Sequence, residues 1–74
     1  MDKKVFLLDK EAYTEAQVNN LTEKDLEEWV AEETYEDNYT IIKIDANNYD
    51  SVDDALKSEG ILFAEDYWIR TFGF

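Results

Sequence analysis

The sequence contains no cysteine, no histidine and no proline, and it has only two glycines. The lack of cysteine excludes disulfides and thiol chemistry. Without cysteine and histidine the chain also lacks the ligands that zinc and most transition metals prefer, so any metal ion would need oxygen ligands. Two isolated glycines do not form a phosphate-binding loop. These absences predict a protein that is not an enzyme and that holds neither a metal ion nor a cofactor.

Long hydrophobic runs are also missing. The longest apolar stretch near the N-terminus is residues 5–8, between Lys4 and Asp9. A signal peptide needs an apolar run of about 7–15 residues and a membrane-spanning helix about 20. We therefore expect a cytoplasmic protein that does not enter a membrane.

Positive charge is scarce, because 7 cationic residues face 19 acidic ones and give a net charge of −12. Nucleic acids and anionic membrane surfaces are themselves negative, so this charge argues against direct binding to either. What the chain has instead is apolar content, with 45% hydrophobic and 15% aromatic residues. That content is typical of a folded protein, and the length predicts one acidic domain over residues 1–74.

Two helix starts follow one another in the first half of the chain. Thr14 and Gln17 form a capping-box pattern, in which each side chain accepts a hydrogen bond from the other residue's backbone amide. Thr22 and Asp25 repeat the pattern with a shorter acidic side chain. The prediction is two short helices, over residues 15–20 and 23–34, with a single bent helix as the alternative.

The remaining segments alternate between strand and helix patterns. β-Branched and aromatic residues predict strands at residues 4–8 and 39–44. Ser51 is a helix cap, and Gly60 lies where a helix C-terminus favours a left-handed residue. Residues 61–72 read as extended, either as one strand with a bulge or as a hairpin. The predicted fold is α+β, a two-layer β-α-α-β-α-β domain with a three- to four-stranded mixed sheet and helices mainly on one face.

The loop over residues 45–50 is rich in aspartate and asparagine, which invites a calcium interpretation. An EF-hand loop needs oxygen ligands at positions 1, 3 and 5, glycine at 6 and glutamate at 12. Counted from Asp45, the chain has Tyr49, Asp50 and Leu56 at the last three of these positions. A turn before a capped helix explains the loop better.

Acidic residues are densest between positions 23 and 37, where eight carboxylates accompany one lysine. One interpretation is a solvated face, which keeps a protein soluble. It would also suit a basic protein partner. Carboxylates one helical turn apart are separated by about 5–6 Å, so the helix could instead mimic the phosphates of DNA or RNA. The candidate acidic partner surface is Asp25, Glu28, Glu32, Glu33, Glu36 and Asp37.

The predicted strands carry large apolar side chains on both faces. Helices on one face would leave the other bare, and such patches are seldom left exposed by monomers. A partner protein or a second copy of the chain would bury the patch, and so would residues 9–20 or the chain end at Phe74. The candidate apolar interface is Tyr39, Ile41, Tyr67, Trp68, Ile69 and Phe72.

No motif in the chain is specific enough to assign a family. The sequence predicts a small non-catalytic protein that serves as a protein–protein interaction module, with no direct binding to nucleic acid. The alternative is an acidic nucleic-acid mimic that inhibits a DNA- or RNA-binding protein.

Overall fold

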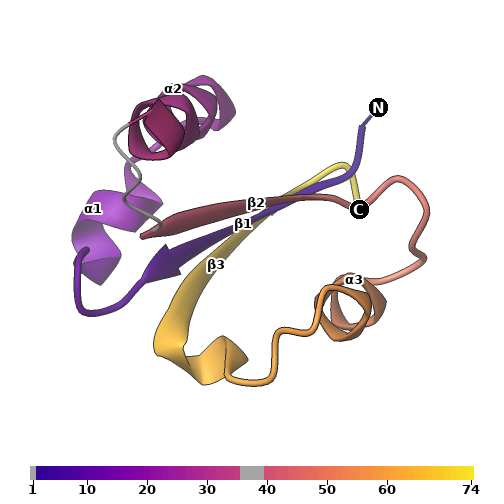
Figure 1. The fold of residues 1–74 in the computed structure, drawn as a ribbon. Helices are drawn as coiled ribbons and strands as arrows, with labels where there is room; N and C mark the ends of the chain where they lie inside the picture. Colours follow the sequence, from indigo (N-terminus) through magenta and orange to yellow (C-terminus); the bar gives the residue numbers. More distant parts are fainter. Residues whose placement is uncertain (1, 36–39) are drawn as a thin grey trace.

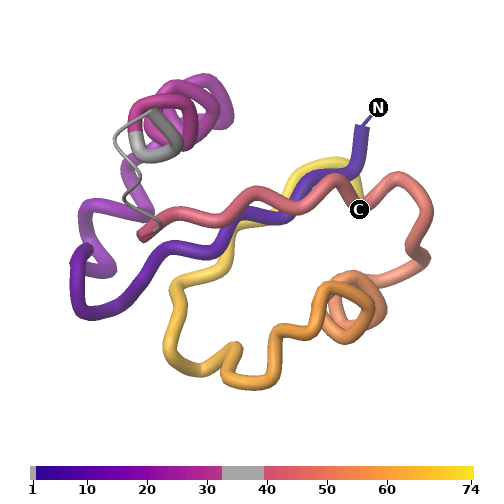
Figure 2. Tube along the Cα trace, in the orientation of Figure 1, coloured from indigo at the N-terminus to yellow at the C-terminus, as the bar shows by residue number. Residues whose placement is uncertain are grey.

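A computed structural model of the chain describes residues 2–35 and 40–74. Figures 1 and 2 show three helices packed against a small sheet, so the predicted α+β class is confirmed. The elements are β1 (Lys4–Asp9), α1 (Glu15–Asn19), α2 (Glu23–Tyr35), β2 (Ile41–Asp45), α3 (Val52–Ser58), the 3₁₀ turn η1 (Ala64–Asp66) and β3 (Tyr67–Phe72).

The sheet has the strand order β2-β1-β3, and β1 is antiparallel to both neighbours. The expected mixed sheet is therefore wrong. β2 and β3 do run parallel to each other, but β1 lies between them, so no two parallel strands pair. Of the three or four strands predicted, the described residues form three, because η1 turns the chain directly into β3 and no hairpin forms over residues 61–72.

Helices cover both faces of the sheet, which corrects the prediction of helices mainly on one face. Figure 1 shows α1 and α2 on one side and α3 on the other. The reason is topological. The segment from β2 to β3 must cross over β1, and because α1 and α2 already occupy one face, α3 crosses on the opposite face.

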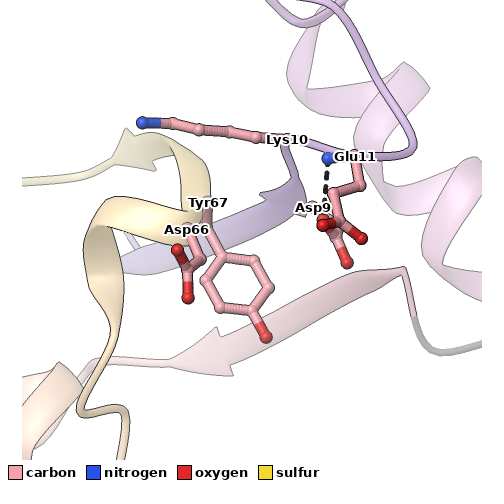
Figure 3. A pocket seen from close by; sticks show the side chains of 5 residues that line it. All are labelled: Asp9, Lys10, Glu11, Asp66 and Tyr67. Carbon is pink, nitrogen blue, oxygen red and sulfur yellow. Dashed lines mark hydrogen bonds between the residues drawn. The ribbon is translucent and has the colours of Figure 1, made fainter.

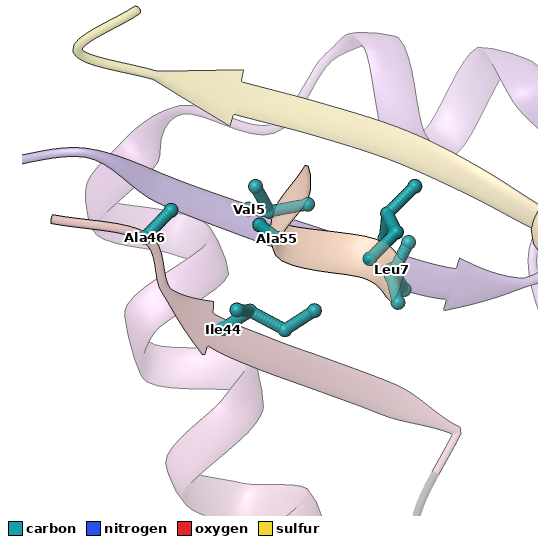
Figure 4. Packing of buried hydrophobic residues seen from close by; sticks show 6 residues of the cluster. Val5, Leu7, Ile44, Ala46 and Ala55 are labelled. Carbon is teal, nitrogen blue, oxygen red and sulfur yellow. The ribbon is translucent and has the colours of Figure 1, made fainter. Parts of the chain in front are cut away.

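The face under α3 holds one of two hydrophobic clusters. Val5 and Leu7 of β1 and Ile44 of β2 pack with Ala55 and Leu56 of α3. Figure 4 shows Val5, Leu7 and Ile44 on this face of the sheet, with Ala55 beside them. The second face of the sheet, which the sequence predicts to be bare, is therefore largely covered by α3.

The face under α1 and α2 holds the second cluster. Phe6 and Leu8 of β1 alternate with the residues of the first cluster and pack with Val18, Leu26 and Ile41. A central strand that is apolar on both faces accounts for this arrangement, since β1 supplies both clusters and Val5, Phe6, Leu7 and Leu8 have no exposed area.

Local sequence signals place the starts of α1 and α2 as predicted. Thr14 and Gln17 form the capping box at α1. Thr22 and Asp25 exchange reciprocal hydrogen bonds of 3.0 and 3.1 Å at the start of α2. Two separate helices therefore form, and the single bent helix is wrong.

The end of α3 is a Schellman motif around Gly60. The Gly60 amide donates to the Lys57 carbonyl at 3.1 Å, and the Ile61 amide donates to the Leu56 carbonyl at 2.9 Å. Gly60 has a φ of 75°, as this motif requires. Ile61 then packs on the first cluster, which fixes the direction in which the chain leaves the helix.

Candidate interaction surfaces

The row of acidic side chains on α2 that faces the sheet is neutralised within the molecule. The Lys4 ammonium lies 3.0 Å from a Glu23 carboxylate oxygen and 3.2 Å from Glu27. Lys43, from β2, lies 2.9 Å from Glu27. Lys4 and Lys43 come from neighbouring strands, and the three ion pairs connect α2 to both of them.

These contacts change the pKa values of two side chains, Glu27 and Lys4. The hydrogen bond from Lys43 is the main cause that lowers the pKa of Glu27, and the bond from Lys4 adds to it. The hydrogen bonds to Glu23 and Glu27 raise the pKa of Lys4. Both shifts favour the charged forms, so Glu23 and Glu27 serve the fold and are not free for a partner.

The structure divides the predicted acidic partner surface. Asp25 acts as a cap, and its bonds to the Thr22 backbone and side chain lower its pKa. Glu28 and Glu32 are exposed on α2, one turn apart. The Glu33 side chain, Glu36 and Asp37 lie outside the described residues.

Three further cations contact backbone carbonyls or an aromatic ring. Lys3 donates to the Tyr49 carbonyl at 3.0 Å, and the Lys10 ammonium lies 4.7 Å from the centre of the Trp68 ring. Arg70, in β3, donates to the carbonyls of Val18 and Leu21 at the end of α1. Cations near a helix C-terminus satisfy its unpaired carbonyls, so Arg70 fixes α1 to the sheet.

The predicted apolar interface does not form one surface. Ile41 is only 4% exposed and belongs to the cluster under α1 and α2. Trp68 and Phe72 pack against that same cluster. Tyr67 and Ile69 lie on the opposite face of β3, and Ile69 is 39% exposed. Tyr39 lies outside the described residues.

Two strongly exposed apolar residues escaped the sequence analysis. Leu62 is 80% exposed and Phe63 is 62% exposed, in the loop between α3 and η1. A shallow groove of about 180 Å³ runs beside them, lined also by Asp66 and Tyr67. The sequence signal is an apolar triplet directly after the glycine that ends α3, a pattern that also predicts the start of a strand.

A second hollow, of about 280 Å³, lies where β1 ends and β3 begins. Figure 3 shows the Asp9, Glu11 and Asp66 carboxylates beside Tyr67, while the Lys10 side chain points away from them. The hollow attracts cations by charge. Within residues 2–35 and 40–74, however, no group of acidic side chains has the arrangement of a metal site.

The chain matches no protein-family model, no curated protein and no solved structure. Among the described residues, no helix is both long and apolar enough to span a membrane.

Proposed function

We propose that this chain is a non-catalytic protein-interaction module whose outward carboxylates bind a cationic protein. The observation that carries the proposal is how the chain uses its own cations. Lys4 and Lys43 neutralise the inner acids of α2, Glu23 and Glu27, whereas Glu28 on the same helix is exposed. The module therefore presents negative charge outward on α2.

Three of the other five cations support the same interpretation, and Lys24 and Lys57 are exposed. Lys3, Lys10 and Arg70 contact carbonyl groups or an aromatic ring, so these three positive charges serve contacts within the fold. A surface field of one sign speeds the approach of an oppositely charged partner and repels other anions. Direct binding to nucleic acid or to an anionic membrane would oppose that field.

A nucleic-acid mimic is the narrower form of this proposal. Glu28 and Glu32 are exposed one turn apart on α2, a spacing that places their β-carbons about 5–6 Å apart. A groove that binds a phosphate backbone would accept such a row. In that case the captured partner would be a DNA- or RNA-binding protein, and nucleic acid would compete with the module for it.

The test is affinity capture from a cell lysate at low salt, followed by elution in a salt gradient and identification of the eluted proteins. The immobilised chain is compared with the double variant Glu28→Lys, Glu32→Lys. We expect wild type to retain basic proteins that leave as salt rises, because exposed charges are screened beyond about 10 Å at 0.1 M salt. The double variant should lose these proteins.

A matched control separates position from total charge. The variant Glu15→Lys, Glu59→Lys changes the net charge by the same amount at exposed positions on α1 and at the end of α3. It should keep most of the captured proteins. Equal loss in both variants would reduce the effect to overall charge, and retention by the α2 variant would refute the proposal.

A further inference from the structure

Within residues 2–35 and 40–74, no strand pairs with the outer edge of β3. The Lys10 amide donates to the Asp66 carbonyl, so these two residues form a hydrogen-bonded pair that continues the register of β1 and β3. Hydrogen-bonded and non-hydrogen-bonded pairs alternate along antiparallel strands. The backbone groups of Ile69 and Thr71 therefore point away from β1, and the sheet ends there.

The two edges of the sheet differ in protection. On β2, the backbone groups of alternate residues hydrogen-bond to β1. Those of Lys43 and Asp45 lie between these positions and point outward. Charged side chains at an edge discourage further pairing. On β3, the outward positions Tyr67, Ile69 and Thr71 carry no charge.

Exposed apolar side chains accompany the open edge. Ile69 is 39% exposed, and it shares its face of the strand with Tyr67. Tyr67 also lines the groove beside Leu62 and Phe63, the two most exposed large apolar residues of those described. An extended segment added along β3 would place every second side chain on this face.

Charge indicates whether a second copy of the chain or a cationic partner would pair with the β3 edge. Residues 67–74 contain no acid, the longest such stretch in the chain, so this edge could be desolvated without burying a carboxylate. A second copy would bring another net charge of −12 against the first. A cationic partner is instead attracted, and the Asp9, Glu11 and Asp66 carboxylates lie where β3 begins.

We propose that β3 accepts an extended segment of a cationic partner as a fourth strand, with apolar side chains on Ile69, Leu62 and Phe63 and a basic residue near the Asp66 end. This inference rests on the proposed function and adds to it the form of the bound segment. Main-chain hydrogen bonds would supply affinity, and alternate side chains specificity.

The probe is an acetylated and amidated peptide of alternating lysine and valine, as long as β3. Its matched control carries N-methyl groups on the amides of every second residue, in two versions that together cover both edges of the peptide. Charge and side chains are unchanged in the control, but one edge cannot donate hydrogen bonds. By calorimetric titration, we expect the version methylated on the pairing edge to bind at least about tenfold more weakly than the plain peptide.

The variant Thr71→Pro tests the protein side. The proline ring replaces an amide hydrogen that points outward and so blocks the edge. The amides that donate to β1 are unchanged. Proline is tolerated in an edge strand where the amide faces solvent. Far-ultraviolet circular dichroism checks that the variant folds. We expect about tenfold weaker binding of the plain peptide, and if the variant does not fold, the methylated peptides alone decide.

Three outcomes overturn the proposed addition of a partner strand. Equal binding of plain and both methylated peptides, all released by salt, would leave charge attraction as the only contact, and the proposed function would stand. Absence of peptide binding would also refute strand addition, and the α2 charge-reversal capture would then judge the proposed function separately. A dimer of the free chain in sedimentation equilibrium that Thr71→Pro abolishes would assign the edge to a second copy.

Discussion

Gly60 and Gly73 both have positive φ angles, of 75° and 85°, but their surroundings differ. A β-carbon at Gly60 would meet no atom within 4 Å. A β-carbon at Gly73 would lie 2.3 Å from the backbone oxygen of Asp2. Gly73 therefore allows the C-terminal segment to approach the N-terminal backbone closely, as the adjacent chain ends in Figure 1 illustrate.

The two glycines predict different costs of substitution. Gly60→Ala should lower the free energy of unfolding by about 1–2 kcal/mol, the cost of a left-handed non-glycine residue. Gly73→Ala carries the same backbone cost and a backbone clash as well, so its loss should be larger. Urea denaturation of both variants measures the difference, and an equal or smaller loss for Gly73→Ala would contradict the described approach of the chain ends.

Arg70 is the residue that fixes α1 to the sheet through two backbone carbonyls. Arg70→Met keeps the aliphatic stem but leaves the carbonyls of Val18 and Leu21 without this donor. We expect a loss of about 1–3 kcal/mol in the free energy of unfolding. Lys24→Met removes the same charge from an exposed position on α2 and should cost far less. Equal losses in the two variants would mean that only charge matters.

At the scale of elements, α2 is attached to the sheet by the ion pairs of Glu27 with Lys4 and Lys43. Because the pKa of Glu27 is lowered below its ordinary value of 4.5, its pairing stabilises the fold above that value and is lost as pH falls through the lowered pKa. The shift on Lys4 is upward from 10.5, so this group stays charged across the acidic and neutral range.

Glu27→Gln tests this element contact. At pH of about 7 we expect wild type to exceed the variant by about 0.5–1 kcal/mol in unfolding free energy, a small value because the pairs are partly exposed. The difference should shrink toward zero in strongly acidic buffer, as pH falls through the lowered pKa and Glu27 protonates. Urea denaturation of both chains at the two pH values measures it. A difference that does not change with pH would mean that packing of the side chain, not its charge, matters.

Element positions were predictable from sequence where the signal is local. The Thr14 and Thr22 caps and Gly60 act within a few residues, and the starts of α1 and α2 and the end of α3 follow from them. The layer arrangement depends on contacts between distant segments. A strand that is apolar on both faces, as β1 is, does not indicate which helix covers which face, and the crossover of α3 decides that.

The candidate surfaces were predictable only in part, for the same reason. The exposed acids Glu28 and Glu32 follow from charge density along one helix. The neutralisation of Glu27 needs Lys43, which is distant in sequence, and the exposure of Phe63 depends on η1 diverting the chain away from a fourth strand. Neither has a local pattern.

At the scale of the whole molecule, a net charge of −12 on 74 residues opposes compaction. Salt screens that repulsion, so raising NaCl from about 20 mM to about 200 mM should raise the melting temperature, by about 4–8 °C for each kcal/mol gained. The Glu28→Lys, Glu32→Lys variant should gain less from salt. A melting temperature that does not change with salt would mean that the carboxylates are better spaced than this account requires.

The most direct test of the central claim is the dissociation constant of a purified captured partner, measured by calorimetry over a range of salt concentrations. Binding through exposed carboxylates predicts that affinity falls at least about tenfold between 50 mM and 300 mM NaCl, and that the Glu28→Lys, Glu32→Lys variant starts weaker and falls less. An affinity that stays constant across this range, equal in wild type and variant, would contradict the claim.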